Sequence, residues 1–537
     1  MDPVDTTGLA EPFLRTQLES LGLAVEYVRA EGDTLYRRGD DGGELPVLDL
    51  VGGFGATILG HHHPEVTALA KELLAAQVPV HAQFSLHPYA EAVARRLNDI
   101  LHRETGDPGP YRAVFANSGA EAVEAAVKHA ELDRGSKAAA LRARIDESVA
   151  RARRAVRDGA RLSETARRLA EGGDFEALAA AVGDANRARA EEPPVLLALT
   201  GGFHGKLVGS VQLTHNPVVR EPFRALATPC RFVPAGDPEA LAAVIAEERR
   251  TLLGLSVSDL GVSSGTDSGG TDPSVSGGVV DVVEHRLPRL CALVLEPVQG
   301  EGGVRPLTAG YLREVQRICA EADCPIVVDE VQSGMGRTGT FLAGSAVGLR
   351  GDYYVLAKSL GGGLAKAAVM LVHHSRHRPE FELLHSSTYA KDAFSTLIAA
   401  RTLDLLEADG GALYRRAAER GERILTRLAG VRDDFKDVVV DVRGRGLMIG
   451  LELRDQADSS SPVLRELSRA DVLGYAAAGY LLHAHALRVF PTASATTTLR
   501  IEPSVRITDA QIDQAETGLR ALCELLRAQD GERLLSR

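Results

Sequence analysis

The sequence is poor in cysteine, in long apolar runs and in net positive charge. Its five cysteines show no metal-type spacing, and their odd number suits a reducing cytoplasm. No apolar run approaches the roughly 20 residues that span a bilayer. The opening residues, MDPVDTTGLAEP, lack the basic and apolar regions of a signal peptide. A net charge of −12 argues against general nucleic-acid binding. We therefore expect a cytoplasmic protein that binds neither membranes nor nucleic acids.

The remaining composition is that of an ordinary globular protein. Hydrophobic residues make up 45% and charged residues 25% of a chain of 537 residues, which is long enough for two or three domains. A histidine run, His61-His62-His63, lies in a GHHHP turn without acidic or thiol neighbours. We expect no metal site there, because three adjacent histidines in a turn lack the spacing and companions of a metal centre.

Two residues of the segment 326–363 carry the clearest chemical signal. Asp329 ends one apolar, strand-like run (IVVD), and Lys358 ends a second one (YYVLAK) directly before a serine and a glycine cluster. This pair suits pyridoxal phosphate (PLP) chemistry, in which a lysine holds the aldehyde as a Schiff base and an acid keeps the pyridine nitrogen protonated. We therefore predict Lys358 and Asp329 as catalytic residues and PLP as the cofactor.

The same segment contains a glycine pattern that is also typical of dinucleotide-binding loops. Gly334, Gly336 and Gly339 spell G-x-G-x-x-G, and Asp352 lies at a plausible distance downstream. Such a loop needs a helix directly after the glycines. The sequence that follows, RTGTFLAGSAVG, is rich in turn residues and poor in helix signals, so we reject a nucleotide site.

Eight segments of the chain follow a known pattern in the right order. They are LDLVGGFGATILGHHHP (48–64), NSGAEAVEAAVKHA (117–130), GGFHGK (201–206), LEPVQGEGGV (295–304), the Asp329/Lys358 region, HSSTY (385–389), VRGRGLMIGLEL (442–453) and LRIEPSVRIT (499–508). Together they resemble the class III (ω-amino) aminotransferases of PLP fold type I. That family includes the ornithine, acetylornithine and 4-aminobutyrate aminotransferases.

Both the residues and the resemblance indicate where the phosphate group would bind. Ser118, Gly119 and Ala120 precede a strongly helical run, so their N–H groups lie at a helix N-terminus, which favours anions. An ordinary N-cap by Ser118 is compatible with this role. Thr388 resembles the threonine that reaches the phosphate from the neighbouring subunit. The resemblance therefore implies a homodimer with shared active sites.

The resemblance also assigns residues to the cofactor ring. It implies that Phe203 stacks on the ring, with His204 beside it, although core packing is the simpler interpretation of a phenylalanine. Val331 is expected on the other ring face, and Gln332 is expected to hydrogen-bond the phenolic oxygen.

Four residues are expected to face the substrate. Arg500 resembles the arginine that clamps a substrate carboxylate, a task that suits a guanidinium fork. Glu301 resembles the residue that pairs with this arginine when an ω-amine binds; a structural ion pair is the alternative. Phe54 stands where the ornithine-type members have a tyrosine, and Lys206 where they have an arginine. AKDAF (390–394) likewise replaces the usual GGNPL.

Strand-like runs that alternate with helical ones predict an α/β protein with a largely parallel sheet. The resemblance makes this an aspartate aminotransferase-like large domain with a mostly parallel seven-stranded sheet, plus a smaller α+β domain. We expect the large PLP-binding domain at residues 84–395. The N-terminal segment 1–83 should join residues 396–537 in the small domain, and a closing amphipathic helix should begin at Thr508 as N-cap.

Two insertions account for the extra length of the chain. Residues 132–194 have apolar residues at helical spacing, broken at Gly172-Gly173-Asp174, which predicts a helical hairpin. Its cationic face suits a carrier protein, an anionic substrate or a partner subunit; a solvated surface elaboration is the simpler interpretation. Residues 255–278 are rich in Ser, Gly and Asp and should form a loop, because this composition cannot bury a core.

These features predict a class III aminotransferase that moves an amino group from an amine or amino acid donor to a 2-oxo acid or carbonyl acceptor, in specialised metabolism. Two alternatives remain open. One is a PLP enzyme of the same fold that does not transaminate: a racemase, a mutase, or an enzyme of γ-replacement or carbon–carbon bond formation. The other is a non-catalytic interaction module.

Overall fold

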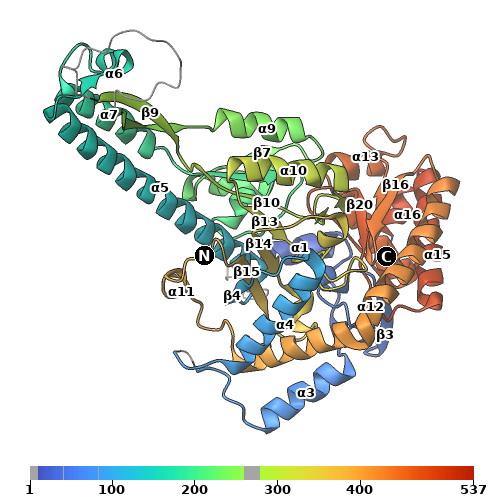
Figure 1. Ribbon diagram of the computed structural model, residues 1–537. Helices are drawn as coiled ribbons and strands as arrows, with labels where there is room; N and C mark the ends of the chain where they lie inside the picture. The colour runs from blue at the N-terminus through green and yellow to red at the C-terminus, as the bar shows by residue number, and fades with distance from the viewer. Residues whose placement is uncertain (1–9, 40, 83, 259–277, 537) are drawn as a thin grey trace, which may run out of the picture.

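The computed structural model describes residues 10–39, 41–82, 84–258 and 278–536. At its centre lies a seven-stranded sheet in the order β4-β15-β14-β13-β10-β6-β7 (Figure 1). All neighbouring strands run parallel except β15, which is antiparallel to both of its neighbours. The predicted, mostly parallel seven-stranded sheet is thereby confirmed. Its strands are β4 (Tyr111–Ala116), β6 (Val195–Leu199), β7 (Cys230–Val233), β10 (Leu290–Leu295), β13 (Ile326–Asp329), β14 (Tyr353–Leu356) and β15 (Ala368–His373).

The central strands are apolar runs because helices cover both faces of the sheet. Val327 belongs to the core under α5 (Gly119–Arg157), which also contains Ala122 and Ala126. Val328, the next residue, belongs to the larger core on the opposite face. The helices that contribute to that second core include α4 (Pro88–Thr105), α10 (Ala309–Ala322) and α12 (Ala393–Asp434).

The N-terminal and C-terminal parts of the chain fold together beside this sheet (Figure 1). One sheet has the order β16-β17-β20-β19, and another joins the N-terminal strands β1, β2 and β3 to β18. β18 (Leu487–Arg488) pairs in parallel with β3 (Glu44–Asp49), so the two ends of the sequence share a sheet. The other strands are β1 (Tyr27–Glu31), β2 (Thr34–Arg38), β16 (Val439–Arg445), β17 (Met448–Leu453), β19 (Phe490–Pro491) and β20 (Thr498–Ile501).

Long helices flank the two sheets formed by the N-terminal and C-terminal parts of the chain. The expected domain boundary at 395/396 falls in the first turn of α12, and the backbone of that helix leaves helical geometry only at Ala408–Gly411. α15 (Asp509–Arg527) begins after Thr508, which forms a capping box with Gln511. The N-cap predicted at Thr508 is confirmed.

Short elements complete the body of the protein. The helices are α1 (Pro12–Ser20), α2 (Gly52–Gly55), α3 (Pro64–Ala75), α8 (Pro217–Arg220), α9 (Pro238–Glu247), α11 (Phe381–Leu384), α13 (Pro462–Arg469), α14 (Leu473–His485) and α16 (Gly531–Leu535). Four 3-10 turns are η1 (Ser210–Leu213), η2 (Glu221–Leu226), η3 (Ser345–Val347) and η4 (Lys358–Gly361), and a small ladder joins β11 (Val298–Gln299) to β12 (Arg305–Pro306).

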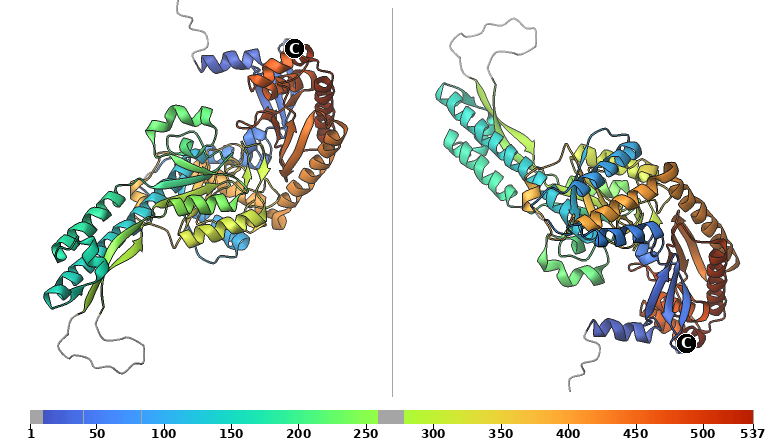
Figure 2. Two further views of the ribbon diagram at one scale, coloured as in Figure 1. Left: turned by 90° about the horizontal axis from the view of Figure 1, so that it is seen from above. Right: turned by 90° about the horizontal axis from the view of Figure 1, so that it is seen from below.

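An arm projects from the body of the protein, as both views in Figure 2 show. α5 runs outward, and α7 (Phe175–Ala190) returns beside it after β5 (Arg161–Leu162) and α6 (Glu164–Leu169). The hairpin of β8 (Thr251–Ser258) and β9 (Val279–Arg286) packs against these helices, and β5 pairs with β9. A separate core, which includes Phe175, Leu178 and Val280, holds the arm together.

Two expectations about the insertions need correction. The helical hairpin forms, but its first helix does not begin near residue 132, because α5 continues without a break from the predicted phosphate helix. The loop predicted from residue 255 begins later, since residues 255–258 extend β8 and bury Leu255 in the arm. The rest of that predicted loop, up to residue 277, lies outside the described residues. Within the described part of the chain, no helix is long and apolar enough to cross a membrane.

Candidate active site

Asp329 lies at the carboxyl end of β13, in contact with His204. Its Oδ2 is 2.8 Å from His204 Nδ1, and its Oδ1 accepts the N–H of Val331 at 3.1 Å. Burial alone would lower the pKa of His204, but the hydrogen bond and the charge of Asp329 outweigh it and raise that pKa. The contact with His204 thus fixes the orientation of the Asp329 carboxyl group at the end of β13.

Lys358 follows the neighbouring parallel strand, β14, and opens the η4 turn with a left-handed backbone (φ 45°). Burial lowers the pKa of its amine, while the charges of Glu502 and Glu301 act in the opposite direction. Its Nζ forms no hydrogen bond or ion pair that the described residues provide. A lysine whose pKa is depressed by burial suits a nucleophilic amine.

The N-terminus of α5 meets Val331 beside these two residues. Ser118 caps the helix through its Oγ, which accepts the N–H of Glu121. A Cβ added to Gly119 would lie 2.8 Å from Val331 Cγ1, so only glycine permits this approach. On the other side, a Cβ added to Gly205 would lie 2.7 Å from the Cβ of Ala120. The predicted phosphate turn and the Phe203–His204 loop therefore pack tightly together.

Arg500 and Glu301 form a buried ion pair, as the sequence pattern suggests. Arg500 is 1% exposed, yet its Nε and Nη1 have no hydrogen-bond partner. The ring of Phe54 lies 4.9 Å from its guanidinium carbon, and Phe54 itself adopts a left-handed backbone (φ 57°). Buried guanidinium donors without acceptors are costly, so this arrangement favours an anionic ligand.

The sequence reasoning missed Glu502, which lies directly after β20 and contacts Gln332. Gln332 Nε2 lies 3.0 and 3.1 Å from the two carboxylate oxygens of Glu502, which is fully buried. Glu502 stands two positions after Arg500, so strand alternation directs both side chains to the same face. This spacing of two residues in LRIEP is the sequence signal that could have identified Glu502 as a site residue.

Four predicted site residues are exposed, namely Phe54, Ser118, Lys206 and Thr388. Lys206 is exposed, in the segment that follows His204. Thr388 is also exposed, in a loop that Asn117 joins to the N-terminus of α5 through a 2.8 Å hydrogen bond from its Nδ2 to Ser387 Oγ.

Two fully buried glutamates near the site were also missed by sequence reasoning. Glu296 accepts the N–H groups of Phe203 and Gly300, and burial raises its pKa to about 7. Glu330 accepts Ser333 Oγ–H and Gly344 N–H, and burial likewise raises its pKa to about 7. Both carboxyls anchor the loops that surround Asp329.

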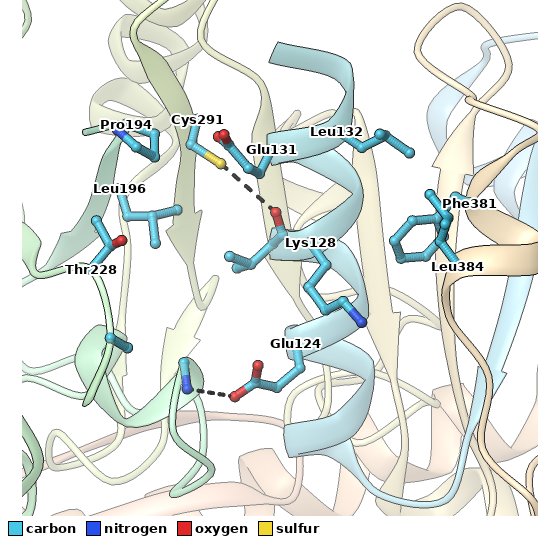
Figure 3. A pocket seen from close by; sticks show the side chains of 13 residues that line it. Glu124, Lys128, Glu131, Leu132, Pro194, Leu196, Thr228, Cys291, Phe381 and Leu384 are labelled. Atoms are coloured by element: carbon cyan, nitrogen blue, oxygen red, sulfur yellow. Dashed lines mark hydrogen bonds between the residues drawn. The ribbon is translucent and has the colours of Figure 1, made fainter. Parts of the chain in front are cut away.

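A separate pocket of about 470 Å³ opens beside α5 (Figure 3). Glu124, Lys128 and Leu132 project from the helix toward it, and Phe381 and Leu384 approach from α11. None of the predicted site residues lines this pocket. Glu124 binds the N–H groups of Gly209 and Ser210, which fixes the segment after Lys206. Across the described residues, no group of His, Cys, Asp or Glu could hold a metal ion.

These residues fit PLP, the cofactor that the sequence pattern predicts. The charge of Asp329 acts on the amine of Lys358, and Val331, two residues after Asp329, contacts Gly119 at the N-terminus of α5. An amine, a carboxyl group and a helix N-terminus are the groups that the binding of an aldehyde, a ring nitrogen and a phosphate requires. The fold and this site define a PLP-dependent enzyme of fold type I.

Comparisons with known proteins agree with a PLP-dependent enzyme of this fold. The family model "Aminotransferase class-III" matches residues 18–522, and the chain belongs to this family; it is a PLP-dependent aminotransferase. A thermostable omega transaminase variant engineered for amine synthesis is similar in structure (TM-score 0.67, 19% identity, 97% of each chain covered). So is the ornithine aminotransferase of Toxoplasma gondii (0.63, 18%, 95% of this chain and 92% of that one). An amine transaminase from an uncultivated Pseudomonas species is also similar (0.63, 21%, 93% and 94%).

The raised pKa of Glu330 predicts a pH-dependent stability. Between pH 4.5 and about 7 the folded protein binds a proton at Glu330 that the unfolded chain has lost, so stability falls as pH rises through this window. Glu330→Gln mimics the protonated form. Between pH 5 and 8 its free energy of unfolding should therefore fall by up to about 3 kcal/mol less than that of the wild type. Urea unfolding of both proteins at pH 5, 6, 7 and 8 measures it. Glu72→Gln, at an exposed site on α3, should keep the wild-type slope; an unchanged slope for Glu330→Gln would contradict the assignment.

Proposed function

We propose that the protein transfers an amino group from an amine or amino acid donor to a 2-oxo acid, with Lys358 and Asp329 as its catalytic residues. One observation supports this above all: Asp329 ends β13, and Lys358 follows the end of its parallel neighbour β14. Arg500, whose charge acts on Lys358, adds unpaired donors to the same site. Replacement of the usual residues by Phe54, Lys206 and AKDAF favours an unusual donor and a role in specialised metabolism.

When bound, PLP supplies an electron sink that stabilises negative charge on the substrate carbon next to the amine. Lys358 would hold the aldehyde carbon and then, once released, move a proton from that substrate carbon. Asp329, oriented by His204, would hold the proton on the ring nitrogen. Ser118, Gly119 and Ala120 would bind the phosphate at the N-terminus of α5, and Phe203 and Val331 would enclose the ring.

Arg500 and Glu301 would allow one site to accept two kinds of substrate. With Glu301 paired, the charge of Arg500 is neutralised, and an ω-amine without a nearby carboxylate can bind. When a 2-oxo acid enters, its carboxylate would take the free Nε and Nη1 donors of Arg500. This exchange fits a two-step reaction in which donor and acceptor bind in turn.

The first experiment is an absorbance spectrum of the PLP-loaded protein before and after addition of a panel of amines. We expect a visible cofactor band that one class of amine converts stoichiometrically into a pyridoxamine band, because the amino group remains on the cofactor. Lys358→Ala should lack the band of the lysine-bound cofactor. A spectrum that changes and then returns to its starting form would favour racemisation, replacement or bond-forming chemistry instead. A wild-type protein that never takes up PLP would contradict the proposal.

Replacing Arg500 should affect the two half-reactions unequally. In Arg500→Lys, the bidentate contact with a carboxylate is lost, so the KM for the 2-oxo acid should rise about 10- to 100-fold. The amine half-reaction should change much less if the donor has no carboxylate near its amine. Stopped-flow spectra of each half-reaction measure this. An equal loss in both would indicate that the Arg500–Glu301 pair is only structural.

We also propose that the protein is a homodimer with shared active sites. Five large apolar side chains lie exposed on two neighbouring segments, here called the apolar rim: Phe84, Leu86, Leu383, Leu384 and Tyr389. The segments touch through His81 and Tyr389, whose rings are 4.7 Å apart. Thr388 belongs to the same loop, so a second copy that covers the rim would bring the threonine of each chain toward its neighbour. Large exposed apolar patches are typical of such contacts.

A double variant of the apolar rim tests this association. Wild-type protein should elute with twice the mass of one chain in size-exclusion chromatography with light scattering. Leu383→Asp combined with Leu384→Asp should shift it to the monomer and weaken PLP retention, because two buried charges oppose the contact. Leu14→Asp, at an exposed position on α1, serves as control and should leave the dimer intact. A monomeric wild type would refute the proposal.

A further inference from the structure

Glu502 has a fully buried carboxyl group, and few hydrogen-bond donors of the described residues surround it. It lies directly after β20, and both of its oxygens accept from the same atom, Gln332 Nε2. It forms no ion pair with any other described residue. A buried carboxylate has room for about four acceptor contacts, so this group is under-satisfied in the protein alone.

The turn around Gly55 brings Glu502 and Lys358 together. A Cβ added to Gly55 would lie 3.4 Å from Glu502 Oε2, so the carboxylate rests against this residue. The carbonyl of Gly55 also accepts the hydroxyl of Ser359, the neighbour of Lys358, at 2.8 Å. Both Glu502 and the start of η4 are thus fixed to one peptide of the chain.

Several charged groups influence the pKa of Lys358. Glu502 is the strongest of the charges that raise the pKa of Lys358, ahead of Glu301 and Asp329, while Arg500 lowers it. Glu502 itself also acts on Arg337 and Arg500. Because a neighbouring negative charge favours a protonated nitrogen, Glu502 opposes the effect of burial on the pKa of Lys358.

Glu502 also engages the amide that the sequence pattern assigns to the phenolic oxygen of the cofactor. Gln332 Nε2 lies 3.4 Å from the Phe54 carbonyl oxygen and close to both oxygens of Glu502. An amide has only two N–H donors. Both therefore have protein acceptors within reach, and Gln332 holds Glu502 in place.

We propose that Glu502 is a positioning residue that keeps a proton on the nitrogen of Lys358 in the PLP-loaded enzyme. The inference rests on the proposed role of Lys358. A protonated nitrogen withdraws electrons from the carbon that the donor amine attacks, so the charge of Glu502 extends the pH range over which the enzyme accepts its donor. Gln332 holds the carboxylate by hydrogen bonds, while Arg337 donates to the carbonyls of Leu447, Pro503 and Gly55 and acts on Glu502 only through its charge.

The visible absorbance of the PLP-loaded protein, titrated with pH, measures this proton directly and needs no substrate. In Glu502→Gln the midpoint of the spectral change should fall by about one pH unit or more, because a neighbouring negative charge has been removed. Glu502→Asp keeps the charge one methylene farther away and should give a smaller shift in the same direction. Glu72→Gln removes an exposed carboxyl on α3, away from the site, and its midpoint should equal that of the wild type.

The outcomes separate this inference from the proposed function. A midpoint in Glu502→Gln equal to that of the wild type overturns the inference, as does a shift of the same size in Glu502→Asp and Glu502→Gln. If Glu502→Gln does not fold, an unchanged midpoint in Glu502→Asp overturns it and a lowered midpoint supports it. A wild-type band that survives Lys358→Ala would instead refute the role of Lys358 itself.

Discussion

The parallel pairing of β13 with β14 is the constraint on which the site depends. Parallel neighbours end at the same edge of a sheet, so Asp329 and the turn of Lys358 emerge side by side. The burial of the neighbouring residues keeps β13 in its register with the adjacent strands. Val327 and Val328, on opposite faces of β13, are each buried in a different core, and a slip by one residue would exchange them. Glu296 and Glu330 then tie the loops beyond the strand ends to the same edge.

The site also gathers several buried acidic and basic side chains. Lys358, Arg500 and Arg337 are the basic side chains of the site, and each is influenced by one or more of the acidic side chains Asp329, Glu301 and Glu502. Only Arg500 and Glu301 form a direct ion pair among these six. A buried pair contributes little net stability, because desolvation offsets most of its attraction. The arrangement makes better sense as a means of setting protonation states and of receiving an anion than as a means of holding the fold together.

The arm shows how a large insertion can be added without disturbing this centre. α5 leaves the sheet by continuing its own axis, so the first turn at Ser118 keeps its place while the last turns lie far outside (Figure 2). The arm also buries its own apolar residues, with Phe175 and Leu178 packed near Leu255 and Val280. Because this core is separate from those of the sheet, the arm adds surface without a rearrangement of the strands.

Local patterns in the sequence determined the strands, the closing helix at Thr508 and the residue types of the site. Apolar runs that end in Asp329 and Lys358 carry their own signal, since a fully buried parallel strand must be apolar throughout. Only the tertiary structure decided which distant residues share the site. His204 meets Asp329 across 125 positions, and Gln332 meets Glu502 across 170. No periodicity encodes such contacts, because they arise from the way separate strands and turns pack. The same reason explains the strand at residues 255–258: its burial depends on the arm helices beside it, which its own composition does not reveal.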